Sequence, residues 1–187
     1  MSNLTSLQSI EFGQWCFGGD NYNGGASSFS LIDLPLLQSV KMGYSAFGST
    51  GSFAMSNLTS LQSIEFGGYC FNSASSFSLI DLPKLQSVKL GNSAFENTRS
   101  FAISNLTSLV SIEFGQWCFK SASSFSLIDL PQLQSVKLGD YAFRNTKTIG
   151  MSILVSLQSI EFGVECFNSA SSFSLIDLPL LQSVKLG

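Results

Sequence analysis

The chain has 187 residues, of which 44% are hydrophobic and 17 are phenylalanine, so it is long and apolar enough to bury a substantial core. Only 11% of the residues are charged and the net charge is −3, which argues against a basic surface for nucleic acid or an anionic membrane. No apolar run reaches the roughly eighteen residues of a membrane span, and Met1 does not open a typical secretory signal.

A repeat of 24 residues organises the whole chain. Its most regular marker is a leucine that recurs at Leu7, Leu37, Leu61, Leu85, Leu109, Leu133, Leu157 and Leu181. The first interval is longer because residues 18–25 contain an insertion. Alternate units are more alike than neighbours, which gives a 48-residue double repeat. Periods of this length are typical of solenoids, so residues 1–187 are predicted to form one solenoid, and the internal match of Met1 with Met55 leaves open that the chain is a fragment of a longer array.

Each unit predicts the same elements in chain order. Alternating apolar and polar residues over 87–90 predict a half-buried strand that ends at Gly91. Ala94 and Phe95 then predict a short helical or 3₁₀ turn, and residues 100–106 predict a second extended segment. Parallel stacking of eight such coils at about 4.8 Å buries apolar columns that no single coil can bury, giving a mostly β solenoid without evident caps.

The pattern L-x-x-L-x-x-[VI]-x-[LF]-G-x-x-[AC]-F resembles the BspA-like leucine-rich repeat family across essentially the whole chain. This resemblance implies a leucine-rich-repeat fold and a surface or adhesion-type protein of a microbe. The phenylalanine-rich second segment and the strict two-unit alternation depart from the family pattern. The motif positions are core positions, so the resemblance specifies the fold more than a ligand.

Glutamate and lysine alternate at one position of successive coils, which we call the charge column. Its members are Glu11, Lys41, Glu65, Lys89, Glu113, Lys137, Glu161 and Lys185. We expect every charge to lie between opposite charges, so that a slip by one coil would bring like charges together. The charge column therefore predicts a register and assembly device.

Catalysis and cofactor binding find little support in the sequence. The chain has no histidine, which removes the commonest general base and most zinc sites. Its cysteines occupy one column: Cys16, Cys70, Cys118 and Cys166. Consecutive members lie two coils apart, about 9.6 Å, which is too far for a disulfide or a shared metal. We predict free thiols that pack as small residues, a non-enzymatic protein, and no cofactor or metal.

Two surface features leave alternatives open. The sequons at Asn3, Asn57 and Asn105 are either N-glycosylation sites or turn residues whose side chains cap the backbone. Aromatic side chains at Trp15, Tyr69, Trp117 and Tyr141, together with Tyr22 in the insertion, form a possible contact surface for a sugar or a partner, or simply cover neighbouring turns.

These features predict a structural and interaction scaffold that self-associates head to tail into a filament, with Lys185 of one molecule meeting Glu11 of the next. The alternative is a cell-surface adhesion or ligand-binding module whose partner is another protein or a glycan. The compartment stays open, because the family resemblance favours the cell surface while free cysteines favour a reducing compartment.

Overall fold

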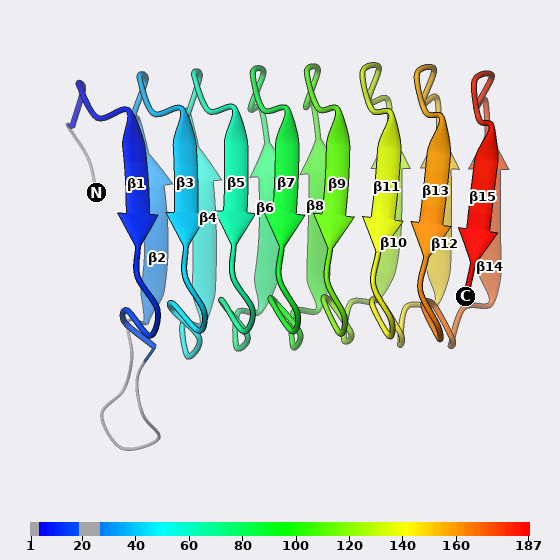
Figure 1. Ribbon diagram of the computed structural model, residues 1–187, viewed down its shortest axis with the longest axis horizontal. Helices are drawn as coiled ribbons and strands as arrows, with labels where there is room; N and C mark the ends of the chain where they lie inside the picture. Colours follow the sequence, from blue (N-terminus) through cyan, green and yellow to red (C-terminus); the bar gives the residue numbers. More distant parts are fainter. Residues whose placement is uncertain (1–3, 19–26) are drawn as a thin grey trace.

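The computed structural model describes residues 4–18 and 27–187, and within these ranges the chain forms fifteen strands and no helix. Successive coils are stacked along one axis, and each coil contributes a front strand and a rear strand that run in opposite directions (Figure 1). The predicted parallel β solenoid is therefore confirmed. Tyr22 and most of the predicted insertion at residues 18–25 lie outside the described ranges.

The front strands form one continuous parallel sheet of eight strands, in the order β1-β3-β5-β7-β9-β11-β13-β15. Each strand places Ile or Val and then Phe, Leu or Met inward, while Ser and the charge column face outward. The front strands are β1 (Ser9–Phe12), β3 (Ser39–Met42), β5 (Ser63–Phe66), β7 (Ser87–Leu90), β9 (Ser111–Phe114), β11 (Ser135–Leu138), β13 (Ser159–Phe162) and β15 (Ser183–Leu186).

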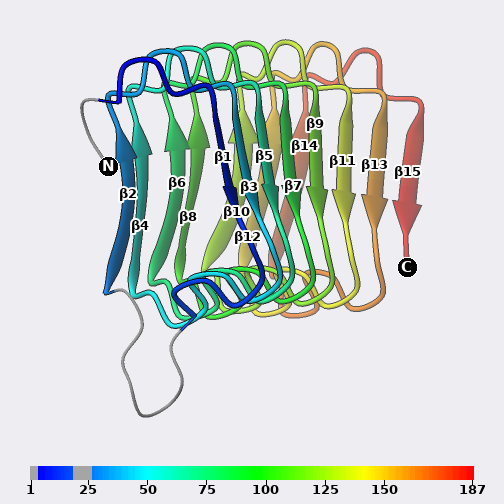
Figure 2. The ribbon, with the colours of Figure 1, turned by 60° about the vertical axis from the view of Figure 1, so that its left-hand side comes forward.

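The rear strands form three separate parallel sheets, β2-β4, β6-β8 and β10-β12-β14. The continuous stacking at about 4.8 Å that the sequence predicts is therefore wrong for the rear face, where pairing stops between β4 and β6 and between β8 and β10 (Figure 2). The rear strands are β2 (Ser28–Ile32), β4 (Ser52–Ser56), β6 (Ser76–Ile80), β8 (Ser100–Ser104), β10 (Ser124–Ile128), β12 (Thr148–Ser152) and β14 (Ser172–Ile176).

Phenylalanine rings stack along the rear strands at a spacing wider than the roughly 4.8 Å of hydrogen-bonded strands. Phe53 and Phe77 stack at 5.7 Å between ring centroids, and Phe101 and Phe125 at 5.6 Å. Rings in the paired steps β2-β4 and β6-β8 have nearly the same spacing, 5.8 and 5.6 Å, so ring spacing does not by itself decide which strand pair opens. In β12 the column continues with Ile149 instead of a ring, and there β10, β12 and β14 pair without interruption.

The core is a set of aliphatic and aromatic columns enclosed by the two faces. Phe95 is fully buried and touches rings from its own and neighbouring coils. Buried threonines tie the coils together, since Thr98 Oγ1 donates to the Ala74 carbonyl at 2.7 Å and Thr146 Oγ1 to the Ala122 carbonyl at 2.8 Å. One cooperative core thus runs along the stack.

The turn after each front strand is not the predicted helical or 3₁₀ segment. Ser93 and Phe95 both have positive φ, 58° and 55°, and these left-handed conformations reverse the chain within a few residues. Gly91 begins this turn, where a Cβ would lie 2.5 Å from the backbone nitrogen of Gly68 in the preceding coil. Close approach of successive turns therefore requires glycine at this position.

Candidate functional site

The charge column lies in the predicted register on the front sheet. Glu11 is opposite Lys41, Lys41 is opposite Glu65, and the alternation continues to Lys185. The side chains are about half exposed, as for Lys89 at 56% and Glu113 at 50%. Each exposed pair contributes little stability, about 0.2–1 kcal/mol, so the column specifies alignment more than it strengthens the fold.

Ion pairs within the charge column are directional, a detail that the alternation alone does not predict. Each lysine before Lys185 reaches the glutamate of the following coil: Lys41 to Glu65 at 3.8 Å, Lys89 to Glu113 at 3.5 Å, and Lys137 to Glu161 at 3.7 Å. Within residues 4–18 and 27–187, Glu11 has no ion-pair partner. Among the described residues, Glu11 is therefore the one glutamate of the column without an ion pair.

The last lysine of the column turns back toward its own chain. Lys185 Nζ donates to Glu161 Oε1 at 3.0 Å, so Glu161 binds two ammonium groups. The hydrogen bond from Lys185 and the nearby charge of Lys137 hold the pKa of the Glu161 carboxyl below its usual value. Lys185 is 72% exposed, so its ammonium remains accessible at the end of the sheet.

All four cysteines are free thiols, as predicted. Cys70 and Cys118 are buried, and the Cys118 thiol donates to the Gly91 carbonyl at 3.1 Å. Burial raises the pKa of Cys118 to about 12, and the pKa values of Cys70 and Cys166 to about 11. Because only the thiolate attacks electrophiles or binds metals, these side chains act as packing residues.

The asparagine sequons lie where the chain turns from a rear strand toward the next front strand. Asn57 and Asn105 are exposed and have positive φ, 56° and 54°. Their side-chain amides donate to an aspartate of the preceding coil, Asn57 to Asp33 at 2.9 Å and Asn105 to Asp81 at 2.6 Å. Asn3 lies outside the described residues. Glycosylation of Asn57 and Asn105 stays a prediction.

Aromatic side chains gather along the turns that follow the front strands. Trp15, Tyr44 and Tyr69 contact one another in sequence, with ring centroids 5.3 Å apart at each step. Trp117 and Tyr141 form a second group, stacked at 4.1 Å with an interplanar angle of 6°. The predicted contact surface is thus divided into two groups. Tyr44 belongs to the first group, but the sequence did not predict this, because Tyr44 lies one residue before the aromatic column.

Between the two aromatic groups lies a hollow of about 240 Å³, which we call the ring slot. Tyr69 and Trp117 form its walls, and Ser93, Glu96 and Lys120 complete the lining. Lys120 Nζ lies 3.7 Å from Glu96 Oε1 and 5.0 Å from the centre of the Trp117 ring. Glu96 and Lys120 occupy equivalent positions of adjacent coils and carry opposite charges, so the sequence could have predicted the ion pair that lines the ring slot.

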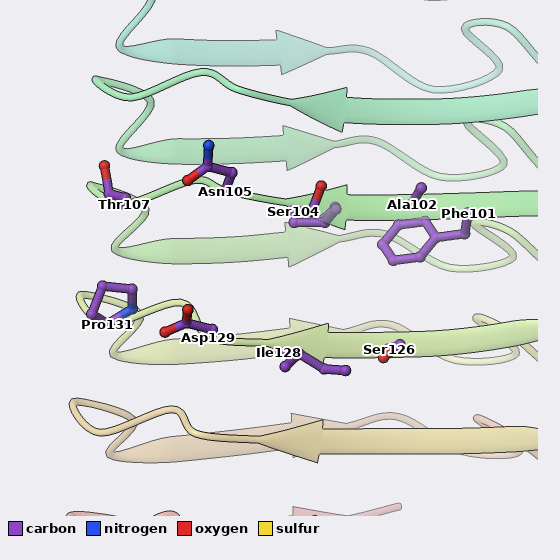
Figure 3. A pocket seen from close by; sticks show the side chains of 10 residues that line it. Phe101, Ala102, Ser104, Asn105, Thr107, Ser126, Ile128, Asp129 and Pro131 are labelled. Carbon is purple, nitrogen blue, oxygen red and sulfur yellow. The ribbon is translucent and has the colours of Figure 1, made fainter.

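A larger hollow, about 510 Å³, follows the open step between β8 and β10 (Figure 3). Phe101 and Ile103 belong to its lining. Asn105 and Asp129 contribute polar groups near one end, and Ser104 lies between them and Phe101. Cα atoms of β8 and β10 still approach within 8 Å. An inserted strand needs about 9.6 Å between its neighbours, so the groove is too narrow to accept one.

The repeat geometry agrees with the comparison to protein families. The family model described as BspA type leucine rich repeat region, with six copies, matches residues 2–124 and 40–174. The chain belongs to the BspA-type leucine-rich repeat family. No match was found among curated proteins or solved structures.

As a BspA-type repeat protein, the chain has the architecture of an interaction scaffold. Within the described residues, no three His, Cys, Asp or Glu side chains are arranged to hold a metal ion. The same ranges contain no helix that is long and apolar enough to cross a bilayer. The candidate interaction surfaces are the charge column, the two ends of the front sheet and the ring slot.

Proposed function

We propose that this BspA-type repeat protein is a non-enzymatic structural scaffold that stacks head to tail into filaments. In the proposed joint, β15 of one molecule pairs with β1 of the next in parallel. The two strands lie at opposite ends of the front sheet, each with one unpaired edge (Figure 1). Such a contact between different surfaces does not close on itself, so it continues into a filament.

The direction of the ion pairs is the observation that carries the proposal. Inside the chain every lysine of the charge column before Lys185 pairs with the glutamate of the following coil. At the joint the following glutamate is Glu11 of the next molecule, which has no ion pair among the residues that the structure describes. Stacking therefore extends the existing pattern by one step without placing like charges together.

Exposed apolar side chains at both ends support the same contact. At one end Phe173, Val184 and Leu186 are 49%, 46% and 63% exposed, beside an apolar hollow of about 300 Å³. At the other end Phe17 is 59% exposed, and it belongs to the same phenylalanine column as Phe167, which lines that hollow. Covering these surfaces with a second copy removes apolar area from water, at about 25 cal/mol per Å².

Charge reversal tests the joint. In sedimentation velocity at rising concentration, the chain is expected to form progressively longer assemblies. Lys185→Glu or Glu11→Lys alone weakens assembly by placing like charges across the joint, and the two reversals together restore it. Lys89→Glu, a matched reversal in the middle of the sheet, changes assembly little. Monodisperse monomers at every concentration, or equal effects of Lys185→Glu and Lys89→Glu, contradict the proposal.

The second candidate function is a ligand-binding or adhesion module. The observation that favours it is the accessible aromatic edge, where Trp15 is 66% and Tyr69 is 43% exposed. Exposed rings arranged along one edge of a repeat protein provide a surface for sugars or partner side chains. The front sheet supports this function less, because its outward serines and charges repeat almost unchanged from coil to coil.

A further inference from the structure

We propose that the ring slot between Tyr69 and Trp117 binds a single pyranose ring of a carbohydrate. This inference gives a ligand class to the second candidate function, and it does not depend on head-to-tail stacking. It follows from the walls of the slot, from a filled counterpart elsewhere in the chain, and from the polar groups at its floor and rim.

The walls are two aromatic rings on coils that are not neighbours. Tyr69 and Trp117 are separated by the coil of Ser93, so their backbones lie about 9.6 Å apart. Each wall is held by contacts outside the slot: Tyr69 packs on Tyr44 at 5.3 Å, and Trp117 stacks on Tyr141 at 4.1 Å. Both walls are therefore supported from behind. Tyr69 presents its remaining surface to the slot, whereas the Lys120 ammonium lies over the slot side of the Trp117 ring, 5.0 Å from its centre.

The chain contains a filled version of the same space. Two coils earlier, Tyr44 occupies the interval between Trp15 and Tyr69, with ring centroids 5.3 Å from each. The residue equivalent to Tyr44 in the coil of Ser93 is Asn92. Its Oδ1 accepts a hydrogen bond from the Gln116 backbone at 2.9 Å, so this side chain is held against the backbone of the next coil. The ring slot is thus a ring-sized interval whose internal occupant is missing.

The floor of the slot is a polar group that lacks a partner. Ser93 is only 4% exposed, and among the described residues its hydroxyl makes no hydrogen bond. At the rim, the Glu96 carboxylate accepts from Asn72 at 3.4 Å and pairs with Lys120. A ligand in the slot therefore meets a free hydroxyl, a carboxylate acceptor and an ammonium donor within one small region.

These properties fit a pyranose better than a flat aromatic ring. A flat aromatic ring can occupy such an interval, as Tyr44 does between Trp15 and Tyr69, but it offers few hydrogen-bonding groups to the polar lining of the slot. The C–H bonds on one face of a pyranose carry partial positive charge and are attracted to the negative face of Tyr69. Its hydroxyl groups both donate and accept, so they can satisfy Ser93, Glu96 and Lys120 together.

Titration with simple sugars tests this assignment. Trp15→Phe leaves Trp117 as the only tryptophan, and its fluorescence reports binding of the methyl glycosides of glucose, galactose, mannose and N-acetylglucosamine. At least one is expected to bind with a Kd of roughly 1 mM, as suits a ligand of this size. Ser93→Tyr, which fills the slot with a residue that the column already carries at 69 and 141, is expected to weaken binding at least about tenfold.

A matched pair of serine variants separates a specific effect from a general one. Ser93→Ala removes the floor hydroxyl and is expected to weaken binding several-fold, whereas Ser45→Ala, in the coil where Tyr44 fills the space, leaves it unchanged. Circular dichroism verifies that each variant is folded. Absence of saturable binding for all four sugars up to about 100 mM overturns the proposal. Undiminished sugar binding by folded Ser93→Tyr also overturns the proposal. Tighter binding of N-acetyltyrosinamide than of any sugar overturns it too, and would indicate that the slot takes an aromatic side chain of a partner.

Discussion

Phe95→Ala is the substitution that most strongly tests the aromatic core. Phe95 is fully buried, and its ring contacts lie at centroid distances of 4.8–6.3 Å. Its partners are Phe53, Phe66, Phe71, Phe77 and Phe119. Truncation of a buried phenylalanine costs about 3–5 kcal/mol, and ring pairs add about 0.5–1.5 kcal/mol each, so the upper part of that range is expected.

Phe17→Ala is the matched control, because Phe17 occupies the same column at the first coil. It is 59% exposed and contacts only Phe12 and Phe47 among the described rings. Its removal is expected to cost less than about 1.5 kcal/mol. Guanidinium unfolding, followed by circular dichroism and by fluorescence of Trp15 and Trp117 on either side of Phe95, measures both changes in the free energy of unfolding. Equal costs for the two variants, or less than about 1 kcal/mol for Phe95→Ala, would refute the reasoning.

Three further predictions concern thiols, a buried hydroxyl and a strained turn. Burial raises the pKa of Cys118 in the folded chain from 9.0 to about 12. The stability that the protonated thiol contributes is therefore complete below pH 9 and is lost as the pH rises toward 12. Cys118→Ala is expected to reduce the fall in the free energy of unfolding over this pH range, measured by unfolding at several pH values. Thr98→Val is expected to lower the free energy of unfolding by about 1–2 kcal/mol, since it leaves the Ala74 carbonyl without its donor; a change near zero in urea unfolding would contradict this. Ile153→Asn is expected to raise the free energy of unfolding by about 1 kcal/mol. Asparagine tolerates the φ of 56° and can donate to Asp129, as Asn57 and Asn105 donate to the aspartates of their preceding coils. An unchanged or lower melting temperature would contradict this prediction.

The repeat period predicted the coil and the pairing of Glu11 with Lys41, because side chains of a parallel sheet stack position by position. It also placed the cysteines two coils apart as free thiols. Aligning the repeats treats each column of equivalent residues separately. The features that the sequence did not predict depend on contacts between different columns. Pairing of the rear strands stops between β4 and β6 and between β8 and β10. The ring slot exists because Tyr44 crosses into a neighbouring column while Asn92 does not.

The turn prediction was wrong for a related reason. Ala94 and Phe95 suggested a helical turn from composition, but the chain reverses through left-handed residues at Ser93 and Phe95. For Asn57 the sequence left glycosylation and backbone capping both open, and its side-chain amide donates to an aspartate of the preceding coil. In both places the adjacent coil, and not the local sequence, determines the conformation and the hydrogen-bond partner.

Electron cryomicroscopy of the concentrated chain tests head-to-tail stacking most directly. The front sheet contributes eight strands, so a filament built by pairing β15 with β1 has a strand spacing of about 4.8 Å and a subunit rise of about 38 Å. In its density, Lys185 of one molecule is expected to lie beside Glu11 of the next. Discrete single molecules at all concentrations, or stacks joined through two copies of the same end, would contradict the account.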